Sequence, residues 1–293
     1  MTIETPNFIP RTIAEIGCNH KGDIEIAKEL ISTAAIFCKA DVVKLQKRCN
    51  QELLTEEQYN APHPNPINSY GDTYGAHREF LEFSPEQHRE LKEYCDGLGI
   101  AYSTSVWDLT SAKEIAAIEP GLIKIPSACN LHFEMLGYLC DNYKGEIHLS
   151  TGMTTQEEVT QIVEFFESKG RNKDLILYAC TSGYPVPVED VCLLEIPRMI
   201  KEYGDRVKSI GFSGHHLGIA IDVAAIVLGA QWIERHFTLD RTWKGTDHAA
   251  SLEPDGMRRL VRDTKNIVKA LTTKASDILP IEEVQRDKLK WRG

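Results

Sequence analysis

Residues 12–46 read TIAEIGCNHKGDIEIAKELISTAAIFCKADVVKLQ, and this stretch decides the fold. Two short runs rich in β-branched and apolar residues, 12–17 and 41–46, predict β-strands. The segment between them has the apolar spacing of a helix, with one face formed by Ala27, Leu30, Ile31, Ala34 and Cys38. A strand, a helix and a second strand in this order form the repeating unit of a parallel sheet with crossover helices.

The same unit continues along nearly the whole chain. The predicted strands are 12–17, 41–46, 100–105, 122–125, 146–150, 175–180, 207–212 and 231–237. Eight strands spaced by helices predict an α/β fold, a single-domain (β/α)8 TIM barrel. A doubly wound open sheet is the alternative, because strand alternation alone does not show that the sheet closes.

The domain boundaries follow from where this alternation stops. We expect the barrel domain to span 1–274 and a short, charged C-terminal tail to span 275–293. Between 47 and 84 the sequence becomes rich in Pro, Asn and Gly, directly after the second strand. This position predicts a long loop at the C-terminal rim of the barrel, where long loops are often functional.

Composition limits the class of protein. The formal net charge is −10 with no basic block, which argues against a nucleic-acid partner. The apolar runs are too short to span a membrane, and the first residues, MTIETPNFIP, lack the profile of a signal peptide. We therefore expect a cytoplasmic protein without membrane contact. Its eight cysteines form no CxxC pair, and we expect reduced thiols.

Barrels of this kind carry their chemistry at the C-terminal ends of the strands, and polar residues stand there in nearly every strand of this sequence. Lys44 and Lys124 lie inside apolar strands, where an ammonium group is costly to bury unless a negative group meets it. Hydroxyl groups flank them at Thr104, Ser127, Ser150 and Ser213. This combination suits a phosphate and a carboxylate. Two alternatives are that each lysine pairs with a buried glutamate such as Glu15 or Glu234, or that one lysine forms a Schiff base.

His215 and His236 stand at the ends of consecutive predicted strands. Imidazoles on adjacent strands can bind a divalent ion, with Glu15 or Asp247 and water completing the coordination. The alternative is that each histidine is an ordinary hydrogen-bonding residue of the core.

Several motifs at these strand ends resemble the sialic acid synthases. They are AEIGCNHKGDIEIAKELI, VVKLQ, YGAHREFLEFS, LSTGM, CTSGYPVPVEDV and FSGHHLGIAIDVAAIVLGAQWIERHFTLDRTWKGTDHAASLEP. They occur in the order of the family and extend from about residue 9 to 271. The resemblance implies a TIM barrel that condenses phosphoenolpyruvate with N-acetylmannosamine or a related aldose sugar and releases phosphate.

The resemblance also implies roles for individual residues and a divalent metal, usually Mn²⁺. The metal ligands would be His215 and His236, with Glu15 close to the ion and, together with His215, Lys44 and Lys124, part of the catalytic group. The phosphoenolpyruvate pocket would comprise Lys44, Thr104, Lys124, Ser127, Ser150, Ser182 and Ser213. The sugar side would comprise Gln46, Tyr184 and Asp247. The family implies a homodimer as the assembly.

Two departures from the family bear on the sugar. Cys129 stands where relatives carry Glu or Asp, so a carboxylate is lost. We also expect the chain to lack the family's C-terminal antifreeze-like domain, which follows a linker similar to ILPIEEVQRDKLKWRG (278–293) and supplies an Arg to the acyl group of the sugar across the dimer. The alternatives to a synthase are a catalytically inactive sugar-binding barrel or subunit, which Cys129 favours, and a Schiff-base aldolase.

Overall fold

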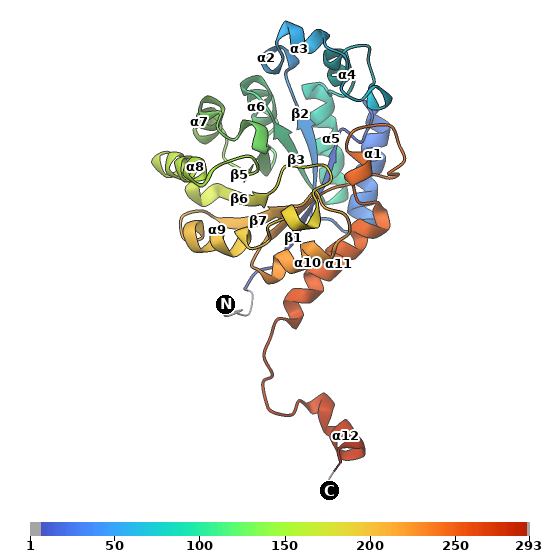
Figure 1. Ribbon diagram of the computed structural model, residues 1–293, viewed down its shortest axis with the longest axis vertical. Coiled ribbons are helices and arrows are strands. Elements are labelled where there is room, and N and C mark those ends of the chain that lie inside the picture. The colour runs from blue at the N-terminus through green and yellow to red at the C-terminus, as the bar shows by residue number, and fades with distance from the viewer. Residues whose placement is uncertain (1–6, 292–293) are drawn as a thin grey trace.

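A computed structural model of the chain describes residues 7–291 (Figure 1). Eight parallel strands close into a barrel in sequence order, and β8 pairs with β1. The strands are β1 (Arg11–Gly17), β2 (Val42–Lys47), β3 (Ala101–Val106), β4 (Leu122–Ile125), β5 (Glu146–Ser150), β6 (Leu175–Cys180), β7 (Ser209–Ser213) and β8 (Trp232–His236). The predicted (β/α)8 barrel is confirmed, because closure excludes the doubly wound open sheet.

Helices connect the strands and form the outer layer of the barrel (Figure 1). The α-helices along the barrel are α1 (Ile24–Ser32), α5 (Pro85–Leu98), α6 (Leu109–Ala116), α7 (Phe133–Asn142), α8 (Gln156–Ser168), α9 (Glu195–Tyr203), α10 (Ala220–Val227) and α11 (Pro254–Ala270). A π-helical turn, η1 (Thr33–Cys38), continues α1. Short 3₁₀ turns are η3 (Ser127–Cys129), η4 (Asn172–Asp174), η5 (Val188–Asp190) and η6 (His248–Ala250).

The hydrophobic core has two layers that position the site. A large outer cluster packs the strands against the helices and includes Ile31 on α1 and Leu45 on β2. A small cluster fills the inside of the barrel with Ile13, Val42, Leu122, Ile176, Tyr178 and Trp232. Strand side chains alternate between the two faces of the sheet. The inward-facing residues that come after this inner cluster, toward the C-terminal ends of the strands, therefore point into the mouth of the barrel.

Residues 47–84 form short helices rather than an irregular loop. They are α2 (Asn50–Leu53), α3 (Glu56–Asn60), the 3₁₀ turn η2 (Pro66–Asn68) and α4 (Tyr74–Phe80). Local capping explains why they form: the Thr55 side chain accepts from the backbone N–H of Gln58, and Thr73 caps α4 through Ala76. The three α-helices gather beyond the end of β2 (Figure 1), at the predicted rim.

The end of the described chain also contains a helix, α12 (Pro280–Leu289), within the stretch predicted as a charged tail. It stands away from the barrel after an extended segment (Figure 1). None of the helices in residues 7–291 has the length and apolar character needed to cross a lipid bilayer. All eight cysteines are free thiols, as predicted.

Candidate active site

A cavity of about 430 Å³ opens at the C-terminal ends of the strands. Every strand end or following loop contributes to its wall, and its size is typical of sites for small molecules. It is lined by Glu15, Lys44, Gln46, Arg48, Ser105, Trp107, Lys124, Pro126, Ser127, Ala128, Ser150, Met153, Cys180, Ser182, Tyr184, Ser213, His215, Glu234, His236 and Asp247. All the site residues predicted from the sequence are therefore brought together here, with the exception of Thr104.

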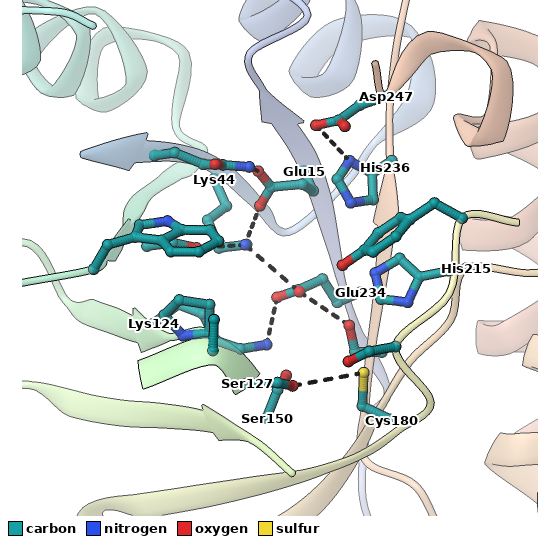
Figure 2. Close-up of a pocket in the computed structure, with 18 of the residues that line it drawn as sticks. Glu15, Lys44, Lys124, Ser127, Ser150, Cys180, His215, Glu234, His236 and Asp247 are labelled. Atoms are coloured by element: carbon teal, nitrogen blue, oxygen red, sulfur yellow. Dashed lines mark hydrogen bonds and ion pairs between the residues drawn. The ribbon is translucent and has the colours of Figure 1, made fainter. Parts of the chain in front are cut away.

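The floor of the cavity is a row of ion pairs that joins four strands. Lys44 Nζ contacts the Glu15 carboxylate on β1 and lies 3.5 Å from Glu234 Oε1 on β8. Lys124 Nζ on β4 lies 2.9 Å from Glu234 Oε2. Figure 2 shows these side chains one after another along the floor, and each is at least nine-tenths buried. Both partners suggested for the lysines by the sequence, Glu15 and Glu234, are confirmed.

The two carboxylates of the floor differ in their electrostatics. Burial alone would raise the pKa of Glu234, but the ammonium groups of Lys124 and Lys44 outweigh it and hold its pKa well below its usual range. For Glu15 burial dominates, so its pKa is raised although Lys44 and His236 oppose the shift. Glu15 is therefore the carboxyl group of the floor that takes up a proton more readily.

Hydroxyl groups form the wall above the lysines. Ser105 Oγ accepts a hydrogen bond from Lys44 Nζ at 2.7 Å, and Ser213 Oγ donates to Glu234 Oε1 at 3.1 Å. Ser127 Oγ accepts from the backbone N–H of Gly152 at 3.0 Å, on the side of the cavity where Ser150 lies (Figure 2). Two ammonium groups below a ring of neutral donors make this half of the cavity suited to an anion.

His215 and His236 lie side by side on the opposite wall (Figure 2). Their ring centroids are 5.4 Å apart, and Asp247 Oδ2 is 3.8 Å from His236 Nδ1. The Nδ1 atoms of both histidines are buried without a hydrogen-bond partner within residues 7–291. Burial, and then the neighbouring His236, lowers the pKa of His215 to about 3, so its imidazole is neutral. Unpartnered nitrogens on adjacent strands, next to a carboxylate, fit a divalent ion.

The mouth of the cavity is formed by larger side chains. Gln46 Nε2 donates to Glu15 Oε1 at 3.2 Å, and the Arg48 guanidinium hydrogen-bonds to Gln46 Oε1. The Arg48 guanidinium also stacks on the Trp107 ring, with 4.6 Å between its central carbon and the ring centroid. Tyr184 lies edge-on to His215, with ring centroids 4.5 Å apart, and 61% of Tyr184 is exposed. These groups frame an opening with both charged and aromatic surfaces.

The prediction for Thr104 is wrong. Its side chain lies outside the barrel, where the hydroxyl donates to the Tyr102 hydroxyl at 2.7 Å, and Tyr102 in turn contacts His88 of α5. Successive strand residues face opposite sides of a sheet, so the residue of β3 that faces the cavity is Ser105. Sequence alternation within β3 was the signal that could have distinguished the two.

Eight lining residues were not assigned to the site from the sequence, and Arg48, Ser105, Cys180 and Glu234 are among them. Glu234 was named only as a possible ion-pair partner. It stands two residues before His236 on β8, and this spacing places both side chains on the same face of the strand, which could have assigned Glu234 to the site. Cys129, in contrast, does not line the cavity. Its thiol contacts the carbonyl oxygens of Val106 and Pro126, at 3.5 and 3.7 Å.

A second cluster with metal-ligand chemistry lies outside the cavity and comprises Cys49, Glu52 and Asp108. Its oxygens already have partners: Asp108 accepts from the backbone N–H groups of Cys49 and Ser111, and Glu52 accepts from the Thr110 hydroxyl. The buried Asp108 caps the N-terminus of α6. The Nδ1 atoms of the two cavity histidines have no hydrogen-bond partner in the part of the chain that the structure describes, so these histidines are the better candidates for a metal centre.

Comparisons with known proteins agree with this geometry. The model of the NeuB family matches residues 30–276. The chain is 38% identical to the N-acetylneuraminate-9-phosphate synthase of Homo sapiens over 97% of this chain and 76% of that protein. It is 32% identical to the N,N'-diacetyllegionaminic acid synthase of Legionella pneumophila, with coverage of 96% and 79%.

A solved structure with the same architecture is that of an N-acetylneuraminic acid synthetase from Leptospira borgpetersenii serovar Hardjo-bovis in complex with citrate. It superposes with a TM-score of 0.79 at 28% identity, and the match covers 98% of this chain and 94% of that one. The similarity therefore extends through the barrel and the strand ends that build the cavity.

Proposed function

Because the chain belongs to the NeuB family, we propose that it condenses phosphoenolpyruvate with the open-chain form of an N-acetylated hexose, N-acetylmannosamine or a related sugar. The alkene carbon of phosphoenolpyruvate forms a bond to the aldehyde carbon, water adds at the former enol carbon, and phosphate leaves. The product is a 2-keto-3-deoxy sugar acid of the sialic acid type. The named relatives are synthases of such sugars but differ in their products, so the family alone does not fix the acceptor.

One observation carries the proposal: the cavity contains two buried lysines and two imidazoles whose Nδ1 atoms have no hydrogen-bond partner among residues 7–291. The lysine half suits the phosphate and carboxylate of phosphoenolpyruvate, because ammonium groups and the Ser127, Ser150 and Ser213 hydroxyls can meet its oxygens. The imidazole half lies on the opposite wall, beside Tyr184 at the mouth, and a sugar aldehyde would approach from that side. The two halves share the floor through Glu234, so both substrates would meet above it.

The charged residues of the cavity floor would have separate roles in binding and in proton transfer. Lys44 and Lys124 would neutralise the anionic substrate, and Glu234 would keep both ammonium groups oriented when the site is empty. Glu15 is the proposed proton-transfer group, because it is buried beside Lys44 and its pKa is raised. Gln46 would fix the orientation of Glu15 through their 3.2 Å hydrogen bond.

His215 and His236 would hold the divalent ion, for which Mn²⁺ is the test ion, with Asp247 next to His236. When bound, the ion would supply Lewis acidity toward the oxygen of the acceptor aldehyde. The neutral His215 would offer a nitrogen lone pair to the ion, and Tyr184 would cover His215 on the side of the opening.

The test is phosphate release from phosphoenolpyruvate in the presence of Mn²⁺ and a panel of aldoses, each with an EDTA control. The panel contains N-acetylmannosamine, mannose and diacetamido hexoses. We expect chelator-sensitive release with an N-acetylated hexose and none without a sugar. Release that persists in EDTA, together with borohydride trapping on a lysine, would indicate Schiff-base chemistry instead. No release with any sugar from a protein that retains Mn²⁺ would contradict the proposal.

A further inference from the structure

Arg235 on β8 is a buried cation in the layer between the barrel and its helices. Glu234 and His236 line the cavity, so the side chain of Arg235 between them points to the outer face of the strand. Ile233 and Phe237, two residues before and after it, belong to the apolar outer cluster. Only 1% of Arg235 is exposed. A guanidinium in such surroundings needs partners from the protein itself.

The partners of Arg235 come from the loop after β7 and from α10. Its guanidinium pairs with the Asp222 carboxylate of α10. It donates to the carbonyl oxygens of Gly218 at 2.9 Å and His216 at 2.6 Å. Arg235 Nη1 also lies 3.0 Å from His216 Nε2, which is 3.2 Å from Asp222 Oδ2. One guanidinium therefore connects β8 to the loop that leads from β7 into α10.

This loop contains one of the two proposed metal ligands, His215, and Arg235 stands next to the other, His236. The backbone N–H of Gly214 donates to the Glu234 carbonyl oxygen at 3.1 Å, and after this bond the loop leaves the sheet. The contacts of Arg235 continue the connection to β8 beyond the end of β7. They fix the backbone on the C-terminal side of His215 relative to His236.

Stability alone does not explain this cluster. Arg235 Nε, His216 Nδ1 and Asp222 Oδ1 are buried without a hydrogen-bond partner among residues 7–291, and each unsatisfied atom has a cost. Apolar side chains of similar volume can often replace a buried ion pair without loss of stability. What a guanidinium adds is geometry, because its planar set of N–H donors holds several acceptors at fixed positions.

We propose that Arg235 is a positioning residue for the divalent ion: its guanidinium holds the loop after β7 so that His215 keeps its place relative to His236. The inference rests on the proposed function, which assigns the ion to these two imidazoles. Arg235 faces away from the cavity and would touch neither the ion nor a substrate. Without its guanidinium, the two ligands would lie on segments that are less firmly joined, and ion binding would have to order the loop.

The test compares Mn²⁺ affinity in two variants that each lose a guanidinium. Arg235→Lys keeps the positive charge but lacks the planar set of donors. Arg171→Lys is the matched control, because the Arg171 guanidinium donates to the Gly145 carbonyl oxygen at 2.9 Å and pairs with Asp174, before β5 at the opposite end of the barrel. Free Mn²⁺ is followed by electron paramagnetic resonance without substrates. We expect the dissociation constant to rise by about tenfold in Arg235→Lys and to stay unchanged in Arg171→Lys.

Phosphoenolpyruvate binding separates positioning from general damage to the cavity. Its affinity, measured by calorimetry in EDTA, should be the same in Arg235→Lys and the parent, since Glu15 and Glu234 hold the ammonium groups of the lysine half. A parallel loss of both affinities would show a general structural role. That result, or equal Mn²⁺ affinity in Arg235→Lys and Arg171→Lys, would overturn the assignment.

The double variant Arg235→Met/Asp222→Leu covers the case in which Arg235→Lys does not fold. It replaces the buried ion pair by apolar side chains, which should keep Tm near that of the parent, and it removes the contacts to the loop. We expect the same weakened Mn²⁺ affinity, and a parent-like affinity would overturn the positioning role. A parent protein that retains no Mn²⁺ would contradict the ion site of the proposed function itself, so the two ideas fail by different results.

Discussion

Glu234 holds the two lysines of the cavity floor in place, because its carboxylate lies between them, 3.5 Å from Lys44 and 2.9 Å from Lys124. Lys44 has a second partner in Glu15, whereas Lys124 has no other carboxylate in contact within residues 7–291. Glu234→Gln therefore leaves Lys124 buried and uncompensated. We expect the variant to lose about 3 kcal/mol in the free energy of unfolding, measured by urea denaturation at pH 7.

The control for this variant is Glu157→Gln at an exposed position of α8, which should change the free energy of unfolding by no more than about 0.5 kcal/mol. Phosphoenolpyruvate should recover more stability in Glu234→Gln than in the parent, because its anionic groups replace the missing charge. Equal free energies of unfolding for Glu234→Gln and the control would contradict the conclusion that Glu234 compensates the buried charge of Lys124.

The same carboxylate makes a pH-dependent contribution to stability. The lysines hold the pKa of Glu234 below its ordinary value of 4.5 in the folded protein, so the unfolded chain binds the proton more readily. The stabilisation is therefore present above about pH 4.5 and is lost as the pH falls toward the folded pKa. Urea denaturation between pH 7 and pH 3 should show a steeper decline for the parent than for Glu234→Gln. Parallel curves would refute this.

Glu15 has the opposite shift and a different expected role. Burial raises its pKa, and it lies within reach of Lys44 and Gln46. Glu15→Gln keeps the shape and removes the titrating group. We expect phosphate release to be abolished while phosphoenolpyruvate binding, followed by calorimetry, remains measurable. Retained turnover would exclude Glu15 as the proton-transfer group.

At the scale of the element, the register of β3 decides which hydroxyl serves the cavity. Ser105 faces inward and accepts from Lys44, while Thr104 faces Tyr102 on the outside. Ser105→Ala should raise KM for phosphoenolpyruvate by roughly tenfold, because a hydrogen bond to a charged group is lost. Thr104→Val should leave KM nearly unchanged and lower the free energy of unfolding by about 1 kcal/mol. A raised KM for Thr104→Val together with an unchanged KM for Ser105→Ala would show that Thr104, not Ser105, contacts phosphoenolpyruvate.

How far the sequence predicts this molecule depends on the element. The eight strands are predicted within about two residues, because apolar runs such as LIKI (122–125) and LILYAC (175–180) are long enough to identify buried parallel strands. Which side chains of a strand point into the barrel was harder to predict. Thr104 and Ser105 are adjacent residues that both carry a hydroxyl group, so residue type alone could not show which of them faces inward. The helices of 47–84 were missed because Thr55 and Thr73 cap segments of only a few residues, too short for helical periodicity to appear.

At the scale of the whole molecule, barrel closure is what brings the ends of the chain's strands to one site. The pairing of β8 with β1 sets His236 in register with Glu15, and their residue numbers differ by more than two hundred. Side chains that converge in this way need the folded barrel to form a metal centre. An ion held there should stabilise the folded state by mass action, because the unfolded chain lacks the arrangement.

Two clusters compete for that ion, and thermal unfolding with Mn²⁺ can separate them. If His215 and His236 hold it, Mn²⁺ at about a hundred times its dissociation constant should stabilise the parent by about 2.7 kcal/mol. Cys49→Ser should keep this shift, since Cys49 belongs to the cluster whose oxygens already have partners. The double variant His215→Ala/His236→Ala should lose both the shift in Tm and the metal retained after gel filtration. A shift that survives in the double variant and disappears in Cys49→Ser would assign the ion to Cys49, Glu52 and Asp108 and remove the metal from the proposed reaction site.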